Sequence, residues 1–374
     1  MKQMTWPALS LVLLAAPAGA ADGKPAVVFV KQIVEDGKAD LRLDWVNTIR
    51  VHGDFVLATS HRDGRVNVFR RDVKTGDLKY LNFVDLAVQL GRPGTHLDAF
   101  PVLAGDNFLY VTGAWTHAHG NADGLGLRWY KFDPKDGPTR LLGAVPCDAG
   151  RLQTTPDGKG LILSAGFSSA FYPITLDGAG KPTVGAKVAG KGLGDVSVPS
   201  PDGKQLYSVS DGAIGRVDVG TDGSVAYGGS CDLSALKPKP ELRAQTVAVS
   251  PDGRHVYAAL WTYKYNALGL FNRDAKTGAL TFAEELKVDP NMVGINHIVF
   301  TADGKTGYYT SSPENSGACL GWFSRDPETG RLAFGGVAEK SKVGPNDFGL
   351  AADGGTIYMA GNWNTRFFNI YRVK

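Results

Sequence analysis

The chain has 374 residues, a net charge of +3 and 43% hydrophobic residues, which is enough for a folded core and too much for a disordered chain. Its 48 glycines and 20 prolines indicate a protein rich in turns. No block of basic residues stands out, so a nucleic-acid partner is not expected. Three cysteines do not make a disulfide framework, although the spacing of Cys147 and Cys231 leaves a pair between them open.

The first 20 residues have the pattern of a secretory signal peptide. Lys2 gives a positive start, Leu9–Ala16 is an apolar run too short to span a bilayer, and Ala18 to Ala20 form a small-residue cleavage site. We therefore expect an exported protein, periplasmic or secreted, with one domain over residues 21–374. No other apolar run reaches membrane-spanning length, so no membrane association is expected after cleavage.

Residues 26–33 are predicted to form a strand that precedes seven repeats. Each repeat contains a tight turn like the one at Pro251 to Gly253, with an alternating apolar run before it and a β-favouring run after it. The aspartates of these turns lie 45 to 52 residues apart, at Asp54, Asp106, Asp157, Asp202, Asp252, Asp303 and Asp353. A sheet-based repeat of this length is typical of a β-propeller blade.

A second phrase recurs at residues 69–76, 271–278 and 323–330, and its Thr-Gly ending predicts a second hairpin turn. Each blade should therefore have four antiparallel strands, with short repeated turns on one face of the ring and variable loops on the other. The last repeat ends in the strand-like run 367–373 and lacks a fourth strand. Because an open edge favours aggregation, we expect the N-terminal strand to complete that blade and close an all-β, seven-bladed propeller.

The inner strands can be aligned by counting back from each turn aspartate. Seven positions back, most residues are amides or acids, where a core would use Val, Ile or Leu. These positions lie at the variable-loop ends of the strands around the channel, so we predict a polar site there, against the alternative that they only bind channel water. The catalytic candidates are His297, Asp347, Arg151 and Asp195. The ligand-binding candidates are Asn47, Gln245, Asn296, Asn346, Trp363 and Arg366.

The variable loops also contain a His-x-His pair, His117 and His119, which could bind a metal ion together with His96. Such a pair without a fixed third ligand is usually incidental. The metal-binding propeller therefore stays an alternative, and no metal or cofactor is assigned to the site.

Two phrases carry a resemblance to a known family. The Ser-Pro-Asp-Gly turn at 250–253, followed by Tyr257, and the Phe-x-Arg-Asp-x-x-Thr-Gly phrase resemble the seven-bladed lactonase family. This family includes the propeller-type 6-phosphogluconolactonases and the fungal carboxymuconate-lactonising enzyme. The likeness covers nearly all of the mature chain, and residues 294–300 look like the family's Gly-Pro-Arg-His-x-x-Phe phrase.

The resemblance implies a seven-bladed propeller that hydrolyses or cyclises a small carboxylated lactone. His297 or Asp347 would then activate water, and Arg151 would bind the carboxylate. The Trp and Tyr residues of the variable loops leave open a non-enzymatic propeller that binds a protein or a ligand on that face. In either case the expected partner is a small molecule or a protein on the variable-loop face.

Overall fold

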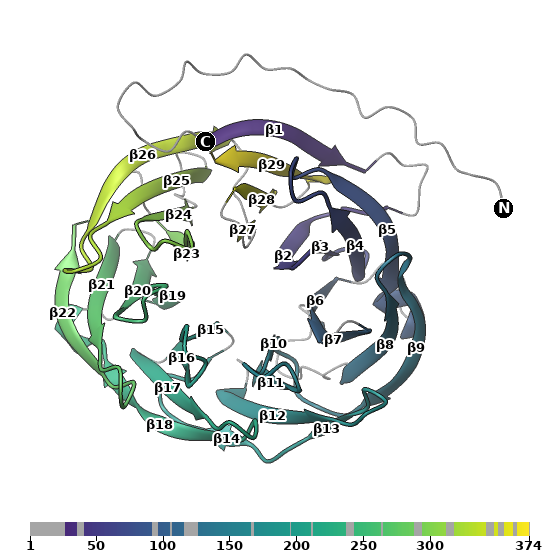
Figure 1. The fold of residues 1–374 in the computed structure, drawn as a ribbon, viewed down its shortest axis with the longest axis horizontal. Helices are drawn as coiled ribbons and strands as arrows, with labels where there is room; N and C mark the ends of the chain where they lie inside the picture. The colour runs from purple at the N-terminus through teal and green to yellow at the C-terminus, as the bar shows by residue number, and fades with distance from the viewer. Residues whose placement is uncertain are drawn as a thin grey trace.

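The chain forms seven antiparallel sheets arranged as blades around a central axis (Figure 1). The computed structural model describes residues 27–35, 41–91, 96–104, 107–115, 126–165, 168–194, 196–210, 212–236, 243–262, 265–287, 294–311, 318–341, 348–350, 355–361 and 365–373. The predicted all-β, seven-bladed propeller is confirmed. Within these ranges, neither helix has the length and hydropathy that a membrane span requires.

In each blade the strands follow one another outward from the axis. Blade 1 comprises β2 (Val46–His52), β3 (Phe55–Ser60), β4 (Arg65–Arg71) and β5 (Leu78–Asp85), followed by the one-turn helix α1 (Leu86–Gln89). Blade 2 comprises β6 (Leu97–Ala104), β7 (Phe108–Trp115), β8 (Leu127–Asp133) and β9 (Gly137–Val145). Blade 3 comprises β10 (Arg151–Thr154), β11 (Gly160–Ala165), β12 (Ala170–Leu176), β13 (Pro182–Val184) and β14 (Val188–Ala189).

The remaining blades follow the same order. Blade 4 comprises β15 (Ser197–Pro199), β16 (Gln205–Ser210), β17 (Ala213–Val219) and β18 (Val225–Asp232), followed by the short 3-10 helix η2 (Ser234–Leu236). Blade 5 comprises β19 (Arg243–Val249), β20 (His255–Thr262), β21 (Tyr265–Arg273) and β22 (Leu280–Leu286). Blade 6 comprises β23 (Ile295–Phe300), β24 (Thr306–Ser311), β25 (Ala318–Arg325) and β26 (Leu332–Ser341).

Blade 7 closes the ring in the way the sequence predicts. It contains β27 (Phe348–Leu350), β28 (Thr356–Ala360) and β29 (Phe367–Val373) from the C-terminus, and its outer strand is β1 (Val27–Val34). The pairing runs antiparallel from Val27 opposite Val373 to Val34 opposite Phe367. Figure 1 shows the purple N-terminal strand lying outside the yellow C-terminal strand. The two ends of the chain are thus held by one hydrogen-bonded ladder.

Blade 3 departs from the predicted four-stranded pattern. Its outer strand is split, because β13 and β14 both pair with β12 at separate places. Pro173 lies in the middle of β12 and has no N–H to donate to an outer neighbour. The interruption falls opposite it, at Gly185, whose N–H donates to the Pro173 carbonyl at 2.8 Å. A proline in the third strand of the blade therefore divides the outer strand.

The hydrophobic core lies between neighbouring blades. Between blades 1 and 2, for example, Leu57 and Val68 pack with Leu97 and Leu109, and all four are completely buried. The middle strands are buried on both faces, as in β11, because each is covered by the blade before it and the blade after it. Cys147 and Cys231 are partly buried and pack against different clusters of this core, and both are free thiols, so the disulfide left open by the sequence does not form.

The two repeated sequence phrases meet across the blade interfaces. The Tyr257 hydroxyl donates to the carbonyl of Gly330 in the next blade at 2.7 Å. The same tyrosine accepts a hydrogen bond from Arg325, whose guanidinium also binds both carboxylate oxygens of Asp252 at 2.8 and 3.1 Å. Arg273, Asp202 and Tyr207 repeat this arrangement one blade earlier. The phrases therefore fasten one blade to the next.

The Tyr308 hydroxyl is the exception to this pattern. It is buried and makes no hydrogen bond with any described residue. The reason is topological: the partner glycine belongs to the turn between the third and outer strands of the next blade, and in blade 7 the outer strand β1 comes from the other end of the chain. Ring closure by a separate strand removes the turn that would accept this hydrogen bond.

This difference predicts unequal effects for two matched substitutions. Tyr257→Phe should lower the free energy of unfolding by about 1–2 kcal/mol, because it removes two buried hydrogen bonds. Tyr308→Phe should leave stability unchanged or raise it, because it removes a buried hydroxyl that has no partner. Urea unfolding of both variants measures the difference. Equal losses would contradict this account of the closure.

Candidate functional site

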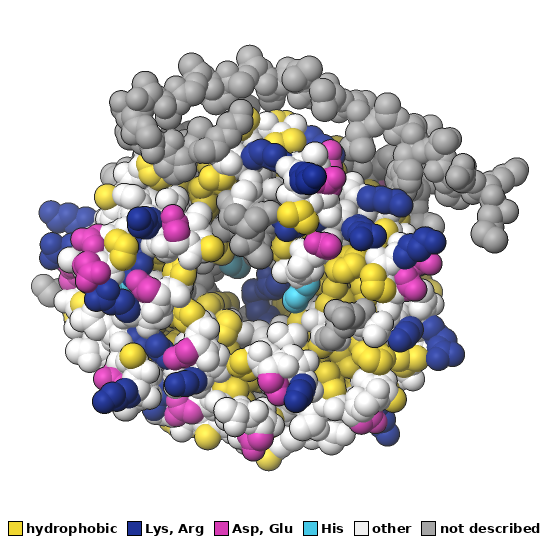
Figure 2. All heavy atoms as spheres, in the orientation of Figure 1, with side chains coloured by type: hydrophobic (Ala, Val, Ile, Leu, Met, Phe, Trp, Pro, Cys, Tyr) yellow, Lys and Arg dark blue, Asp and Glu magenta, His cyan; other side chains and the backbone are white. Residues whose placement is uncertain are grey.

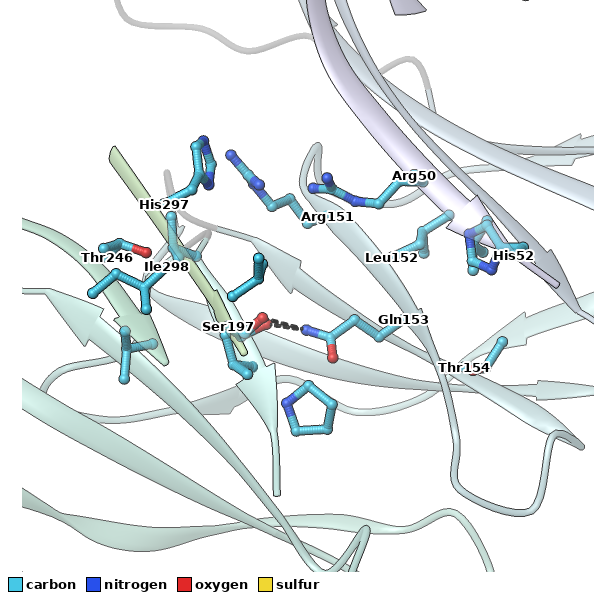
Figure 3. Close-up of a pocket in the computed structure, with 16 residues that line it drawn as sticks. Arg50, His52, Arg151, Leu152, Gln153, Thr154, Ser197, Thr246, His297 and Ile298 are labelled. Carbon is cyan, nitrogen blue, oxygen red and sulfur yellow. Dashed lines mark hydrogen bonds between the residues drawn. The ribbon is translucent and has the colours of Figure 1, made fainter. Parts of the chain in front are cut away.

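A cavity of about 330 Å³ lies at the propeller axis, where the innermost strands of six blades meet. Its lining comes from β2, β6, β10, β15, β19 and β23. Figure 3 draws the lining residues as sticks. The volume is at the lower end of the range for small-molecule sites. The polar and charged residues of the lining are Arg50, His52, Arg151, Gln153, Thr154, Ser197, Thr246 and His297.

The cavity is electropositive. Two guanidinium groups, from Arg50 and Arg151, lie in the same part of the cavity as the imidazole of His297 (Figure 3). Among the described residues that line it, none is Asp or Glu. Figure 2 shows dark blue and cyan side chains around the central opening of the ring. Such a set of groups favours a small anion, because several positively charged or protonatable groups are gathered in one concave site.

The backbone before Arg151 is held in one position. A Cβ at Gly150 would lie 2.0 Å from the carbonyl oxygen of Ser164, so the chain can approach this closely only with glycine. The Thr112 hydroxyl donates to the Gly150 carbonyl. The Arg151 guanidinium then lies 5.6 Å from the ring centre of Phe100, in a cation–π contact. These contacts aim a charged side chain from the start of β10 into the cavity.

The wall between blades 3 and 4 is held by uncharged hydrogen bonds. Gln153 donates through Nε2 to the Ser197 carbonyl at 2.9 Å and to its hydroxyl. The Ser197 hydroxyl is also 2.5 Å from that of Ser164. These bonds tie β10 to β15, so this side of the cavity presents saturated polar groups. The ionisable groups of the lining are therefore those of Arg50, Arg151 and the two histidines, His52 and His297.

His52 is the imidazole at the opposite end of β2 from the variable loops. Burial, and then the charge of Arg50, lower the pKa of His52 from 6.5 to about 4. Its Nε2 atom is buried and makes no hydrogen bond with any of the described residues. At neutral pH the His52 side chain is therefore an uncharged part of the lining, whereas Arg50 and Arg151 carry positive charge.

The low pKa of His52 predicts a pH dependence of stability. Between pH 6.5 and 4 the unfolded chain binds a proton at this position that the folded chain does not, so stability falls as the pH falls through that window. The loss between pH 7 and pH 4.5 should be about 2–3 kcal/mol smaller in His52→Gln than in the natural protein. Urea unfolding at the two pH values measures it. An identical loss in both proteins would contradict the assignment.

The structure brings two of the predicted catalytic residues together, since Arg151 and His297 line the same cavity. Their roles remain predictions. Asp195, Asp347, Asn346 and Trp363 lie outside the described residues, as do His117 and His119 of the predicted metal set and the side chain of Gln245. In the part of the chain that the structure describes, no three His, Cys, Asp or Glu residues are grouped to hold a metal ion.

The predicted ligand-binding residues are arranged differently from the expected ring. Asn47, Gln245 and Asn296 each fall at a β-bulge, where the register of β2, β19 and β23 shifts against the next strand. A bulge inserts one extra residue and turns its side chain away from the regular alternation. Neither Asn47 nor Asn296 is part of the cavity lining. Counting along an unbroken strand could not show this.

Arg366 lies elsewhere. Its side chain is 61% exposed, and its guanidinium is 3.5 Å from a carboxylate oxygen of Asp44 and 3.8 Å from one of Glu35. Arg366 is therefore part of an ion-pair group where blade 7 meets blade 1, and it does not line the cavity. The sequence could not show this ion-pair group, because the two carboxylates, more than 300 residues earlier in the chain, become neighbours of Arg366 only when the ring closes. Its role in ligand binding stays a prediction.

Arg50 and His52 were missed by the sequence reasoning. A signal for them existed, because they stand four and two positions before the turn residue Asp54, on the same side of β2 as the position six back. Only the variable-loop ends of the strands were considered. The cavity extends further along the axis, so positions nearer the turns also line it.

Fold and site together define a seven-bladed β-propeller with a cationic axial cavity. No protein-family model matches the sequence, and no curated protein is significantly similar to it. Solved structures are similar in fold. The periplasmic gluconolactonase PpgL of Pseudomonas aeruginosa matches with a TM-score of 0.63 and 16% identity, over 86% of each chain. A candidate 6-phosphogluconolactonase from Bacteroides uniformis matches with a TM-score of 0.62 and 20% identity, over 83% of this chain and 88% of that one.

A third neighbour has a different named activity. The hydrazine synthase of Kuenenia stuttgartiensis matches with a TM-score of 0.60 and 16% identity, over 90% of this chain and 97% of that one. At these identities the comparisons show the fold alone, which this chain shares with proteins of different named activities. Because one fold carries unrelated chemistries, the function must be argued from the cavity.

Proposed function

We propose that this protein is a lactonase-like hydrolase that binds a small anionic lactone in its axial cavity. The observation that carries the proposal is the meeting of Arg50, Arg151 and His297 in one cavity whose described lining has no acidic residue. A cavity of about 330 Å³ suits a molecule of roughly monosaccharide size. The names of the gluconolactonase and 6-phosphogluconolactonase neighbours support a lactone as the substrate.

The groups present have the chemistry that lactone hydrolysis needs. A guanidinium can hold the carboxylate or another anionic group of the substrate through paired N–H donors. A second guanidinium can stabilise the negative charge that develops on the lactone carbonyl oxygen when water attacks it. An imidazole near these groups, that of His297, can exchange a proton with the reacting oxygen.

We further propose that the protein is exported, to the periplasm or out of the cell. The signal-like pattern of residues 1–20 supports this, and one neighbour in fold is named as a periplasmic enzyme. Separation of cell fractions, followed by mass determination of the mature N-terminus, tests it. A protein that stays with the cytoplasmic fraction and keeps residues 1–20 would overturn this part of the proposal.

The activity is tested with the purified mature protein and a panel of lactones, by the proton released on ring opening. Turnover is expected with a carboxylated lactone such as D-glucaro-1,4-lactone, at higher kcat/KM than with an uncharged lactone such as γ-butyrolactone. Absence of turnover across the panel would overturn the proposal that the protein is a lactonase. If calorimetry then showed binding of D-glucarate to the cavity, the binding propeller would be the correct alternative.

A further inference from the structure

Asp98 is the one acidic residue in the seven innermost strands, as far as the structure describes them: β2, β6, β10, β15, β19, β23 and β27. It lies in β6, which pairs with β7 in continuous register from Leu97 to Ala104. Side chains therefore alternate regularly along β6, and Asp98, Phe100 and Val102 share one side of it. Val102 lines the cavity, and Phe100 contacts the Arg151 guanidinium. Asp98 is thus at the variable-loop end of a column that leads into the cavity.

The Asp98 carboxylate is held by two donors from blade 1. His61 Nδ1 lies 2.8 Å from Asp98 Oδ1, and the Asn47 side-chain amide donates to the same oxygen. Because a carboxylate only accepts, Asn47 must present its NH₂ group to Asp98. The hydroxyl of Thr59, completely buried in β3, sets this orientation by donating to Asn47 Oδ1 at 2.6 Å. The bulge in β2 is what places Asn47 within reach.

In the His61–Asp98 pair, the histidine is buried and held in place, whereas the aspartate is partly exposed. The His61 side chain is 3% exposed, and its ring lies 4.2 Å from that of Trp45 and 5.1 Å from that of His96. The Asp98 side chain is 27% exposed. Both of its hydrogen bonds with described residues use Oδ1, so neither engages Oδ2. A fixed carboxylate with one uncommitted oxygen is the arrangement that a general base requires.

We propose that Asp98 is the general base of the reaction, an inference that rests on the proposed lactone hydrolysis. Asp98 Oδ2 takes a proton from water while the water oxygen bonds to the lactone carbonyl carbon. The ring acyl C–O bond then breaks, and the ring oxygen takes a proton from the His297 imidazolium. The product is the open hydroxy acid, and exchange with solvent returns the proton from Asp98 to His297. His61 and Asn47 are positioning residues. Among the described residues, the charged or titratable groups around this pair are His61 itself, His96 beside the His61 ring, and Arg151 beside Phe100 on the same side of β6.

The test compares Asp98→Asn with the natural protein on the carboxylated lactone. The variant should lose 10²- to 10⁴-fold in kcat, keep its KM and its D-glucarate affinity within about threefold, and lose the acidic limb of the pH–rate profile. Asp136→Asn, in the exposed turn between β8 and β9, is the matched control and should retain full activity. Adding formate to Asp98→Ala should restore part of the rate.

The outcomes separate the two proposals. If the natural protein hydrolyses no lactone, the proposed function fails. If it does, and Asp98→Asn keeps more than a tenth of kcat with both limbs of its profile, only the assignment of Asp98 fails. Should both Asp98 variants unfold, His61→Gln decides: a kcat about tenfold lower at unchanged KM, with folding confirmed by circular dichroism, supports the assignment, and an unchanged kcat overturns it.

Discussion

Replacing Arg325 with methionine is expected to lower the free energy of unfolding by about 3 kcal/mol, because it leaves a partly buried carboxylate and a buried tyrosine without their partner. The Arg325 side chain is completely buried between blades 5 and 6. Its guanidinium binds Asp252, the Tyr257 hydroxyl and the Gly304 carbonyl. Methionine can fill the space of the side-chain stem, so the loss reports the missing charge and hydrogen bonds.

A matched control lies six residues further along the same blade. Arg331 forms a 2.7 Å ion pair with Glu284, but its side chain is 68% exposed. Ion pairs of this kind add little to stability, so Arg331→Met should leave the urea midpoint unchanged. Urea denaturation of both variants is the measurement. A similar loss in both would show that the repeated phrases do not fasten the blades.

The equivalent contact one blade earlier, between Asp202 and Arg273, should lose its contribution to stability only in strong acid. Although burial raises it, hydrogen bonds from Ser200 and then from Arg273 bring the pKa of Asp202, the equivalent residue in blade 4, down to about 2. A carboxyl whose pKa is lower in the folded chain contributes stability above the unfolded value of about 4, and this contribution is lost as the pH falls from about 4 through about 2. The blade contacts should therefore persist in moderate acid.

Replacing Arg151 with glutamine is expected to weaken binding of an anionic lactone or its sugar acid about 10- to 100-fold, because a charge-assisted hydrogen bond is replaced by a neutral one. The effect should appear in KM and in the calorimetric affinity for D-glucarate. For uncharged lactones KM should change little, because they have no anionic group for the arginine to hold. This selectivity separates a loss of anion recognition from a general loss of structure.

Arg140→Gln is the control for this prediction, since Arg140 is exposed on β9, the outer strand of the neighbouring blade, and is not part of the cavity lining. It should bind and hydrolyse the same substrates as the natural protein. If Arg151→Gln kept its affinity for D-glucarate, the cavity would not be the anion site, and the proposed function would lose its main support.

The neighbours in fold show why the cavity, and not the blades, must carry the functional argument. Two of the three are named for lactone chemistry and one for hydrazine synthesis, at similar TM-scores and identities. The blade contacts through Tyr257 and Arg325 belong to the scaffold and would serve any of these activities equally well. The proposed function therefore depends on Arg50, Arg151 and His297, which line the axial cavity.

The repeats were enough to predict the fold because each turn is set by a few adjacent residues. Pro, Asp and Gly at the turns favour the required backbone angles, as the positive φ of 68° at Gly253 shows, and the regular spacing of seven such turns is visible in one sequence. The sequence also predicted closure by the N-terminal strand. The last repeat lacks an outer strand and the first repeat is preceded by an extra one, so pairing the two removes an open sheet edge.

The site was determined only in part by the sequence. Arg151 and His297 could be named, since their positions relative to the turn follow from period-two counting along a strand. The bulges at Asn47 and Asn296 broke that counting, because a bulge depends on the pairing of two strands and leaves no mark in either strand alone. The pairing of His61 with Asp98 and the ion pairs of Arg366 join residues of neighbouring blades. Such contacts are decided by tertiary structure, since closing the ring sets which residues of separate blades face each other.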